Sequence, residues 1–146
     1  MDERTEMYIA YCKELDKYDD APGMFRKDPA DVVRKYSEDP DVTWRDIVCC
    51  GEIAGFLVTL TVGKPRPITH VAEAYVKPEY RGRGLMRKAV ADALKDAQDV
   101  SMEVYKQNPA TTFWKKVMAE CGYECVRECN FFLNDSLKVY FYRKKP

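Results

Sequence analysis

The sequence predicts an α/β (α+β) domain in which helices cover one mixed central sheet. Three observations predict this class: two helical patterns open the chain, three β-rich runs follow, and helical and β patterns then alternate. The predicted element order is ααβββαβαββ. A length of 146 residues, with 46% hydrophobic and 33% charged residues, fits one domain over residues 1–146. The same composition excludes a disordered chain.

The first two elements are predicted as helices. Residues 5–18 place aromatic and apolar side chains on one helical face. A second helix is predicted to begin at Asp28-Pro29, because aspartate is a favoured N-cap and proline is favoured at the first helical position. This helix is expected to stop before Pro40, since the residue before a proline avoids helical geometry.

The middle of the chain is predicted to form three strands. β-rich runs at Trp44–Cys49 and Glu52–Val62 flank Cys50-Gly51, a pattern typical of a hairpin. Ile68–Val76 is the third run. Strict alternation along this run places three side chains on one face: Val71, Glu73 and Tyr75.

The C-terminal half alternates between helical and β patterns. The predicted elements are a loop at Lys77–Gly84, a helix at Leu85–Ala97, a strand at Val100–Tyr105, a helix from Asn108-Pro109 to Gly122, and strands at Cys125–Leu133 and Leu137–Tyr142. Asn134-Asp135-Ser136, which joins the last two strands, consists of residues typical of turns.

The charge balance excludes several classes of protein. Twenty-four Lys and Arg against 24 Asp and Glu give a net charge of zero, so a general nucleic-acid binder is not expected. No apolar run approaches the ~20 residues of a membrane span. The charged start Met1-Asp2-Glu3-Arg4 does not resemble a signal peptide. We therefore expect a cytoplasmic protein with no membrane partner.

Three of the six cysteines, Cys121, Cys125 and Cys129, are spaced by four residues. On a helix they would share one face and could bind a soft metal ion. The segment from Tyr123 onward, however, is predicted as a strand, where positions four apart are separated by roughly 13 Å. Free thiols, and no metal site, are the expectation.

The stretch from Val76 to Met86 carries the pattern most informative about function. A strand enters it and a helix leaves it, and Gly82 and Gly84 permit positive φ values between them. Such a loop can direct several N–H groups into one hollow beside the positive end of a helix dipole, which suits a pyrophosphate. Three basic residues add local charge: Arg81, Arg83 and Arg87. A plain surface turn is the alternative.

Other phosphate-binding patterns fit this stretch less well. It contains no Gly-Lys-Ser/Thr, as a P-loop requires, and it lacks the third glycine of a dinucleotide-binding fingerprint. The string Arg81-Gly82-Arg83-Gly84 is also found in RNA-binding segments. A single copy framed by a strand and a helix does not favour that function.

The same segment resembles the acetyl-CoA loop of the GNAT superfamily of N-acetyltransferases. In that family a strand ending in Val-x-Pro precedes Arg/Gln-x-x-Gly-x-Gly/Ala at the start of a long helix. Val76-x-Pro78 is present here, and Arg81-x-x-Gly84-x-Met86 matches except at its last position. Methionine replaces a small residue there, which bears on how tightly the loop binds pyrophosphate.

Later segments extend the resemblance. Val104-x-x-x-Asn108, an aromatic pair and Gly122-Tyr123 are similar to later motifs of the family, and the predicted hairpin is similar to its second and third strands. Roughly residues 5–142 follow the family's element order.

The resemblance implies a GNAT-like fold in which two parallel strands, Ile68–Val76 and Val100–Tyr105, splay apart. Acetyl-CoA (coenzyme A) is the implied cofactor, with its pantetheine arm in the gap and its thioester oxygen bonded by backbone groups near Tyr75 and Val76. Asn108 equally suits a helix cap. The implied cofactor-binding residues are Tyr75, Val76, Arg81, Gly82, Arg83, Gly84, Leu85, Met86 and Asn108.

An amine must lose a proton before it attacks a thioester, so a general base is needed at neutral pH. Glu73, three residues before Val76 in an apolar stretch, is the first candidate. Burial there would raise its pKa toward neutrality. Glu103, on the other splayed strand, is the alternative base, and a structural role for Glu73 also remains open.

The departing thiolate needs a proton donor, for which many family members use a tyrosine on the helix after the asparagine. Trp114 is the nearest match here, and an indole N–H is not an acid of suitable strength. Tyr105 is the candidate that replaces it, with Tyr123 or water as alternatives.

The first 45 residues correspond to one wall of the acceptor site in the family. They contain aromatic and acidic residues that would suit a cationic amine, although core packing and solubility explain them equally well: Tyr8, Tyr11, Tyr18, Asp19, Asp20 and Phe25.

The predicted function is therefore transfer of the acetyl group of acetyl-CoA to a primary amine of a small molecule, peptide or protein. The alternative is a non-catalytic acyl-CoA-binding sensor or interaction module. An exposed edge strand and the segment Tyr140-Phe141-Tyr142 leave a homodimer open.

Overall fold

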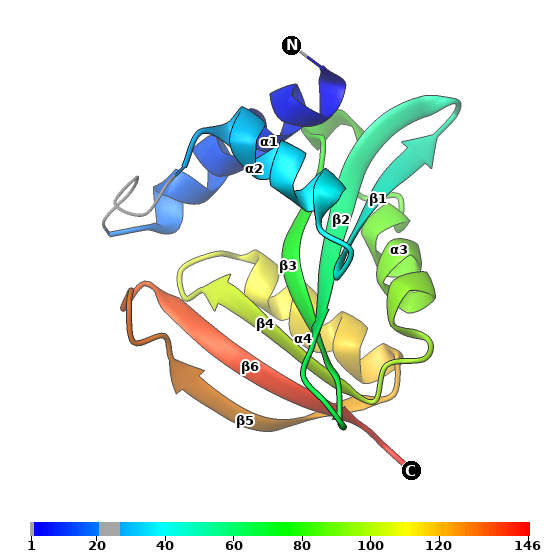
Figure 1. The fold of residues 1–146 in the computed structure, drawn as a ribbon, viewed down its shortest axis with the longest axis vertical. Helices are drawn as coiled ribbons and strands as arrows, with labels where there is room; N and C mark the ends of the chain where they lie inside the picture. Colours follow the sequence, from blue (N-terminus) through cyan, green and yellow to red (C-terminus); the bar gives the residue numbers. More distant parts are fainter. Residues whose placement is uncertain (1, 21–26) are drawn as a thin grey trace.

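The computed structural model describes residues 2–20 and 27–146 and places a six-stranded sheet between helices (Figure 1). The helices are α1 (Glu3–Leu15), α2 (Pro29–Glu38), α3 (Leu85–Leu94) and α4 (Ala110–Glu120), with 3₁₀ turns η1 (Asp16–Tyr18) and η2 (Pro78–Tyr80). The strands are β1 (Val42–Cys49), β2 (Glu52–Val62), β3 (Ile68–Val76), β4 (Asp99–Tyr105), β5 (Tyr123–Asn130) and β6 (Leu137–Lys144). The predicted class and element order are confirmed.

The sheet has the order β1-β2-β3-β4-β6-β5, and only the central β3–β4 pair is parallel. The boundaries of β2 and β3 agree with the prediction. β5 ends at Asn130, earlier than predicted, because the chain turns from Phe131 onward. The amide of Phe131 donates to the carbonyl of Leu137, and that of Asn134 donates to the carbonyl of Phe131.

The two N-terminal helices begin at side-chain caps. Asp2 accepts a hydrogen bond from the amide of Thr5 at 2.8 Å. Asp28 accepts one from the amide of Ala30 at 2.9 Å, with Pro29 at the first helical position, as predicted. These bonds satisfy amides that have no partner inside a helix.

Two apolar clusters pack on opposite faces of the sheet. The first lies against α3 and α4, and its largest fully buried members are Leu57, Leu94, Met102 and Met118. The second lies under α1 and α2 and includes Met7, Tyr8, Val33, Phe56 and Tyr75. Figure 1 shows α1 and α2 crossing the β1–β3 half of the sheet, so β4 and β6 are not covered by them on that face.

A bulge in β3 corrects the predicted alternation. The pairing of β2 with β3 skips Ala72 between Val71 and Glu73. Val71 consequently packs in the cluster below α3, whereas Tyr75 packs below α1. The expectation that Val71 shares a face with Glu73 and Tyr75 is wrong, because one extra residue reverses every side chain before it.

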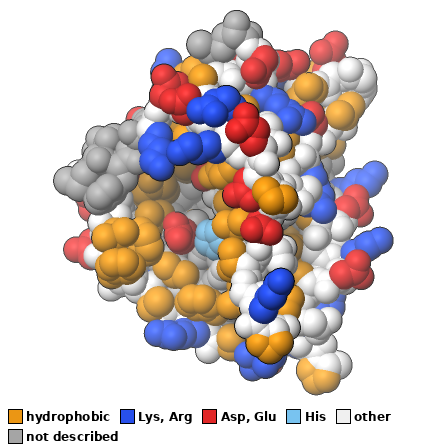
Figure 2. Space-filling model, viewed as in Figure 1, with side chains coloured by type: hydrophobic (Ala, Val, Ile, Leu, Met, Phe, Trp, Pro, Cys, Tyr) orange, Lys and Arg blue, Asp and Glu red, His pale blue; other side chains and the backbone are white. Residues whose placement is uncertain are grey.

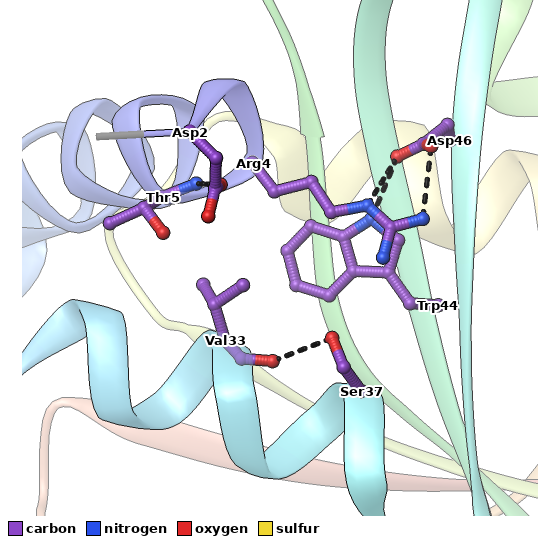
Figure 3. Close-up of polar contacts among 7 residues, drawn as sticks. All are labelled: Asp2, Arg4, Thr5, Val33, Ser37, Trp44 and Asp46. Atoms are coloured by element: carbon purple, nitrogen blue, oxygen red, sulfur yellow. Dashed lines mark hydrogen bonds and ion pairs between the residues drawn. The ribbon is translucent and has the colours of Figure 1, made fainter.

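A polar contact fixes the start of α1 on β1 (Figure 3). Arg4 donates to both carboxylate oxygens of Asp46, at 3.1 Å from Nε and 3.0 Å from Nη2. The indole N–H of Trp44 donates to the same carboxylate at 2.9 Å, and the guanidinium lies 5.3 Å from the Trp44 ring centre. A bidentate pair of this kind restrains the direction of the helix as well as its position.

β2 and β3 approach each other closely at Gly55. A Cβ built on Gly55 would lie 2.0 Å from the carbonyl oxygen of Tyr75, well inside van der Waals contact. Glycine is therefore required at this position by space, and β3 is held against β2 along the segment that precedes the loop.

The strands at the two edges of the sheet are β1 and β5. Of the segment proposed as a dimer contact, Tyr140 and Tyr142 are each only 5% exposed and belong to the cluster below α3 and α4. Only Phe141 stays half-buried at the surface. Within the described ranges, no helix combines the length and apolar character needed to cross a membrane.

Candidate functional site

The loop between β3 and α3 has the backbone geometry that its glycines predict. Gly82 and Gly84 have φ angles of 81° and 74°, and a Cβ on either would meet nothing within 4 Å. The amide of Lys88 donates to the carbonyl of Gly84, the first backbone bond of α3. The N–H groups of residues 85–87 therefore have no partner within the helix and face the loop at its positive end.

Met86 lines the cavity and also contacts the core. Its side chain is half-buried and packs against the apolar cluster below α3, together with Ala89 and Ala93. The larger side chain is thus accommodated by the core, and the backbone of the first helical turn remains regular.

The three arginines near the loop have different roles. Arg81 is held in place, because Nε donates to the carbonyl of Val76 at 2.8 Å and Nη2 donates to Glu14 at 2.7 Å. The guanidinium of Arg83 is exposed and lies 5.3 Å from the Tyr80 ring centre. Arg87 pairs with Glu120 of α4 at 3.0 Å, on the exposed side of α3.

β3 and β4 pair for only four residues and then separate. Their parallel register runs from Ile68 opposite Asp99 to Val71 opposite Met102 and ends there. Beyond this point a cavity of about 780 Å³ opens between the strands. It reaches from Trp114 on the α4 side to Tyr11 on the α1 side, so it passes through the sheet. The predicted splay of the two parallel strands is confirmed.

All the predicted site residues line this one cavity. They are Glu73, Tyr75, Val76, Arg81, Gly82, Arg83, Gly84, Leu85, Met86, Tyr105 and Asn108.

The backbone of β3 presents alternate residues to the gap. The carbonyl of Tyr75 points toward β2, since it lies beside Gly55, and the amide of Lys77 donates to the carbonyl of Ala54 at 2.8 Å. Successive residues of a strand direct their polar groups to opposite sides. The N–H and C=O of Ala74 and Val76 therefore point away from β2, toward the gap.

Glu73 stands at the point where the strands separate, on the side of the sheet that α1 covers. The pKa of its carboxyl is raised to about 7, mainly by burial; a hydrogen bond from the hydroxyl of Tyr8 lowers it, and the charge of Glu103 adds a smaller increase. A carboxylate with a pKa near 7 can both accept and release a proton at neutral pH. This is the property expected of a general base.

Glu103 faces the same cavity from β4, next to His70. The Nε2 atom of His70 lies 4.0 Å from Oε1 of Glu103, and its Nδ1 atom lies 2.8 Å from Oγ of Ser101. Burial lowers the pKa of His70 despite the nearby carboxylate, which favours the neutral imidazole.

Tyr105 lies at the end of β4, half-buried in the cavity lining. Its hydroxyl donates to Oδ2 of Asp19 at 3.1 Å. Tyr123, an alternative proton donor, is 2% exposed, and its hydroxyl donates to the backbone carbonyls of Leu94 and Ala97. Tyr123 is therefore a core residue that joins β5 to the end of α3.

Asn108 acts as a cap for α4 and also lines the cavity. Its side-chain oxygen accepts from the amide of Ala110 at 2.9 Å, and its carbonyl accepts from the hydroxyl of Thr111. Trp114, at the position where a tyrosine was expected, lines the cavity from α4 and packs edge-on against Phe113.

The wall predicted from the first 45 residues is present in part. Tyr11 and Tyr18 line the cavity, and Tyr8 contacts Glu73. The amide of Asp20 donates to Oγ of Ser136, which ties the wall to the β5–β6 connection. Phe25 lies outside the described residues.

Two features of the site were not predicted. Tyr8 bonds Glu73 across 65 positions of sequence, and no local pattern indicates that pairing. His70 has no role in the sequence-based prediction. Regular alternation would place it on the face opposite to Glu73, so no pattern in the sequence indicated that it lies beside Glu103.

The cysteines in the described part of the chain are free thiols. Cys125 and Cys129 lie on β5, as the strand prediction requires, and Cys121 follows α4. Residues 2–20 and 27–146 contain no group of three or more His, Cys, Asp or Glu side chains placed to bind a metal ion.

Comparisons with known proteins agree with this geometry. A family model described as acetyltransferase (GNAT) family matches residues 6–119. No curated protein matches the sequence. An acetyltransferase from Bacillus subtilis, solved in complex with CoA, has 18% identity over 100% of this chain and 95% of that chain, with a TM-score of 0.63.

Two other solved structures share the fold at low identity. Ribosomal-protein-S5-alanine acetyltransferase from Vibrio fischeri has 15% identity, a TM-score of 0.67, and coverage of 98% of this chain and 88% of that one. Spermidine N-acetyltransferase from Vibrio cholerae, in complex with CoA and spermine, has 13% identity, a TM-score of 0.65, and coverage of 96% and 89%. Because the family model covers most of its length, the chain belongs to the acetyltransferase (GNAT) family.

Proposed function

We propose that this protein transfers the acetyl group of acetyl-CoA to a primary amine, by direct attack of the amine within a ternary complex. The observation that carries the proposal is Glu73, a carboxylate with a pKa of about 7 placed where β3 and β4 separate. A base at this position can take the proton of an ammonium group on the α1 side of the sheet.

The loop at residues 81–86 fits the pyrophosphate of the cofactor. Its glycines have positive φ, its helical amides have no intrahelical partner, and Arg83 is exposed beside it. Solved structures of other acetyltransferases on this fold hold CoA or acetyl-CoA, which supports the same ligand here. Acetyl-CoA supplies an activated acyl group, and the protein supplies position and proton transfer.

Residues of this chain accept the proton of the amine, stabilise the charge on the acyl oxygen and return a proton to the sulfur. Glu73 accepts the proton that the attacking nitrogen loses as the C–N bond forms and the C–S bond breaks. N–H groups of Ala74 and Val76, which point into the gap, are placed to stabilise negative charge on the acyl oxygen. Tyr105 is the hydroxyl at the end of the gap that returns a proton to the leaving sulfur.

A non-catalytic acyl-CoA-binding module is the second candidate. Trp114 at the expected tyrosine position favours it, as does the hydrogen bond that Tyr105 already donates to Asp19. Both candidates require the loop and the cavity. Only the acetyltransferase requires Glu73 to ionise near neutral pH.

Two measurements test the proposal. Calorimetry with acetyl-CoA should show binding that weakens in Arg83→Ala but not in Arg66→Ala, since Arg66 pairs with Asp99 at the far end of β4. A thiol-release assay over a panel of amines should then show turnover that falls by about 10²-fold or more in Glu73→Gln. Binding with no turnover on any amine would favour the module, and absence of binding would exclude both.

A further inference from the structure

The cavity has an acidic, aromatic side that the transfer step does not use fully. Figure 2 shows a hollow on the α1 side of the sheet, with acidic and hydrophobic side chains around it. Nε2 of His70 lies 4.0 Å from Oε1 of Glu103, and Glu103 lines the cavity. With Glu73 as the base, Glu103 has no role in the proposed transfer step.

Among residues 2–20 and 27–146, the only basic side chain that lies within 4.0 Å of the Glu103 carboxylate is His70. His70 is largely buried, bonded to Ser101, and favoured in its neutral form. In the described part of the chain, no lysine or arginine forms an ion pair with Glu103 or Glu73. Lys27 and Lys35 line an adjoining smaller pocket at α2, and both are exposed to solvent.

Glu103 and Glu73 are close enough to affect one another. They follow the last parallel pair, Val71 and Met102, on neighbouring strands, which lie about 4.8 Å apart where paired. Burial is the main cause of the raised pKa of Glu73 and of Tyr36, on α2, and the charge of Glu103 adds a smaller increase to both. Two like charges in one cavity are stabilised by a ligand with a positive charge for each.

The lining between and around the two carboxylates suits ammonium groups joined by a short apolar chain. Tyr11 and Tyr105 line both the main cavity and the pocket at α2, and Tyr36 closes the latter. Aromatic faces attract ammonium groups and also pack against methylene groups. A single ammonium beside Glu73 would leave Glu103 unmatched.

We propose that Glu103 determines acceptor specificity by binding the second ammonium group of a dicationic amine, whose first amine reacts beside Glu73. This inference rests on the proposed function and adds the class of acceptor: an aliphatic diamine or polyamine with a short spacing between nitrogens. His70 lies beside Glu103, with 4.0 Å between Nε2 and Oε1.

The kinetic test compares matched acceptors at saturating acetyl-CoA. 1,4-diaminobutane and n-butylamine have the same carbon chain and differ by one ammonium group. We expect kcat/KM to be at least about tenfold higher for the diamine, mainly through a lower KM. In Glu103→Gln this preference should fall by about tenfold, with Glu103→Asp intermediate. Glu124→Gln, which removes the same charge from the exposed surface of β5, should leave the preference unchanged.

A binding measurement keeps the inference testable without turnover. Because the chain has one histidine, the untagged protein gives one set of imidazole NMR signals, from a ring 4.0 Å from Glu103. With CoA present, 1,4-diaminobutane should shift these signals saturably, n-butylamine should not, and the response should be lost in Glu103→Gln.

The outcomes separate the two proposals. Equal kcat/KM for the two amines, or an equal loss for both in Glu103→Gln, overturns the role of Glu103 and leaves acetyl transfer standing. No turnover with any amine overturns acetyl transfer. If, in addition, the imidazole NMR signals of His70 do not shift when the diamine is added, the diamine site is overturned as well.

Discussion

The hydroxyl of Tyr105 donates a hydrogen bond to Oδ2 of Asp19 at 3.1 Å, across 86 positions of sequence. The side-chain amide of Asn134 donates to the other oxygen of the same carboxylate at 3.0 Å. Asp19 therefore connects the segment after α1 both to the end of β4 and to the β5–β6 connection. The outer end of the gap is bounded by this contact, so the proposed proton donor is also part of a structural link.

Substituting Tyr105 and Asp19 in turn distinguishes a proton-donating role of Tyr105 from a structural one. Tyr105→Phe should lower kcat by about 10²-fold if the hydroxyl returns a proton to sulfur. Asp19→Asn disturbs the same link but keeps the hydroxyl, so its loss of kcat should be much smaller. Both variants should lose about 1 kcal/mol of unfolding free energy in urea titrations. An equal loss of kcat in the two would assign Tyr105 a structural role alone.

The ionisation of Glu73 should appear in the pH dependence of the rate. Because the base must be ionised, kcat at saturating substrates should rise with pH and reach a plateau above the Glu73 pKa of about 7. This inflection should vanish in Glu73→Gln. In Glu103→Gln it should move to lower pH, because the charge of Glu103 raises the pKa of Glu73. A profile that Glu73→Gln leaves unchanged would assign the base elsewhere.

The same pKa predicts a change in stability with pH. The Glu73 pKa is about 7 in the folded protein against an ordinary value of 4.5, so between these values the folded state binds more protons than the unfolded state. Stability should therefore fall by about 3 kcal/mol as pH rises through this window. At pH 8 the free energy of unfolding of Glu73→Gln should exceed that of the unsubstituted protein, and at pH 4 this advantage should be absent. Urea unfolding at both values measures this, with Glu124→Gln as the control that should show no such difference.

Gly84 and Gly122 form a matched pair for testing the loop. Both have positive φ, 74° and 88°, and a Cβ added to either would lie no closer than 3.9 Å to a neighbouring atom. Alanine at either should cost about 1 kcal/mol of stability through backbone strain. Only Gly84→Ala should also weaken acetyl-CoA binding in calorimetry, because Gly122 lies after α4, away from the loop. Equal affinities in the two variants would argue against pyrophosphate binding at residues 81–86.

Gly55→Ala should lower the free energy of unfolding far more than the addition of one methyl group usually does. The added methyl group would lie 2.0 Å from the carbonyl oxygen of Tyr75, which is backbone and cannot move without displacing β3. A loss of about 3 kcal/mol or more in unfolding free energy is expected. Gly51→Ala, with nothing within 4 Å of the new atom, is the control and should cost only its backbone strain. A loss no larger than that of the control would show that β2 and β3 can separate.

The element order was predictable from the sequence because most elements have strong local signals. Asp28-Pro29 marks the start of α2, and the periodicity from Leu85 marks α3. The end of β5 was not predictable locally, since its apolar pattern continues through Phe131 to Leu133. Hydrogen bonds within the β5–β6 connection end the strand instead.

The site was predictable where it depends on one segment of chain. Gly82 and Gly84 indicate their backbone angles directly, and Glu73 could be placed near the gap by its distance from Val76. Contacts between distant segments could not be predicted in this way. The bond from Tyr8 to Glu73 depends on how α1 crosses the sheet, which the pairing of Arg4 with Asp46 helps to set.

The cavity that passes through the sheet gives the two substrates separate entrances. Cationic side chains surround the end near Arg83, and carboxylates face the end near His70. If the proposed function is correct, an anionic donor and a cationic acceptor are attracted to opposite sides of the molecule, and binding of one does not block the other. Random-order addition, with intersecting lines in double-reciprocal plots of initial velocity, is the kinetic behaviour that this arrangement favours.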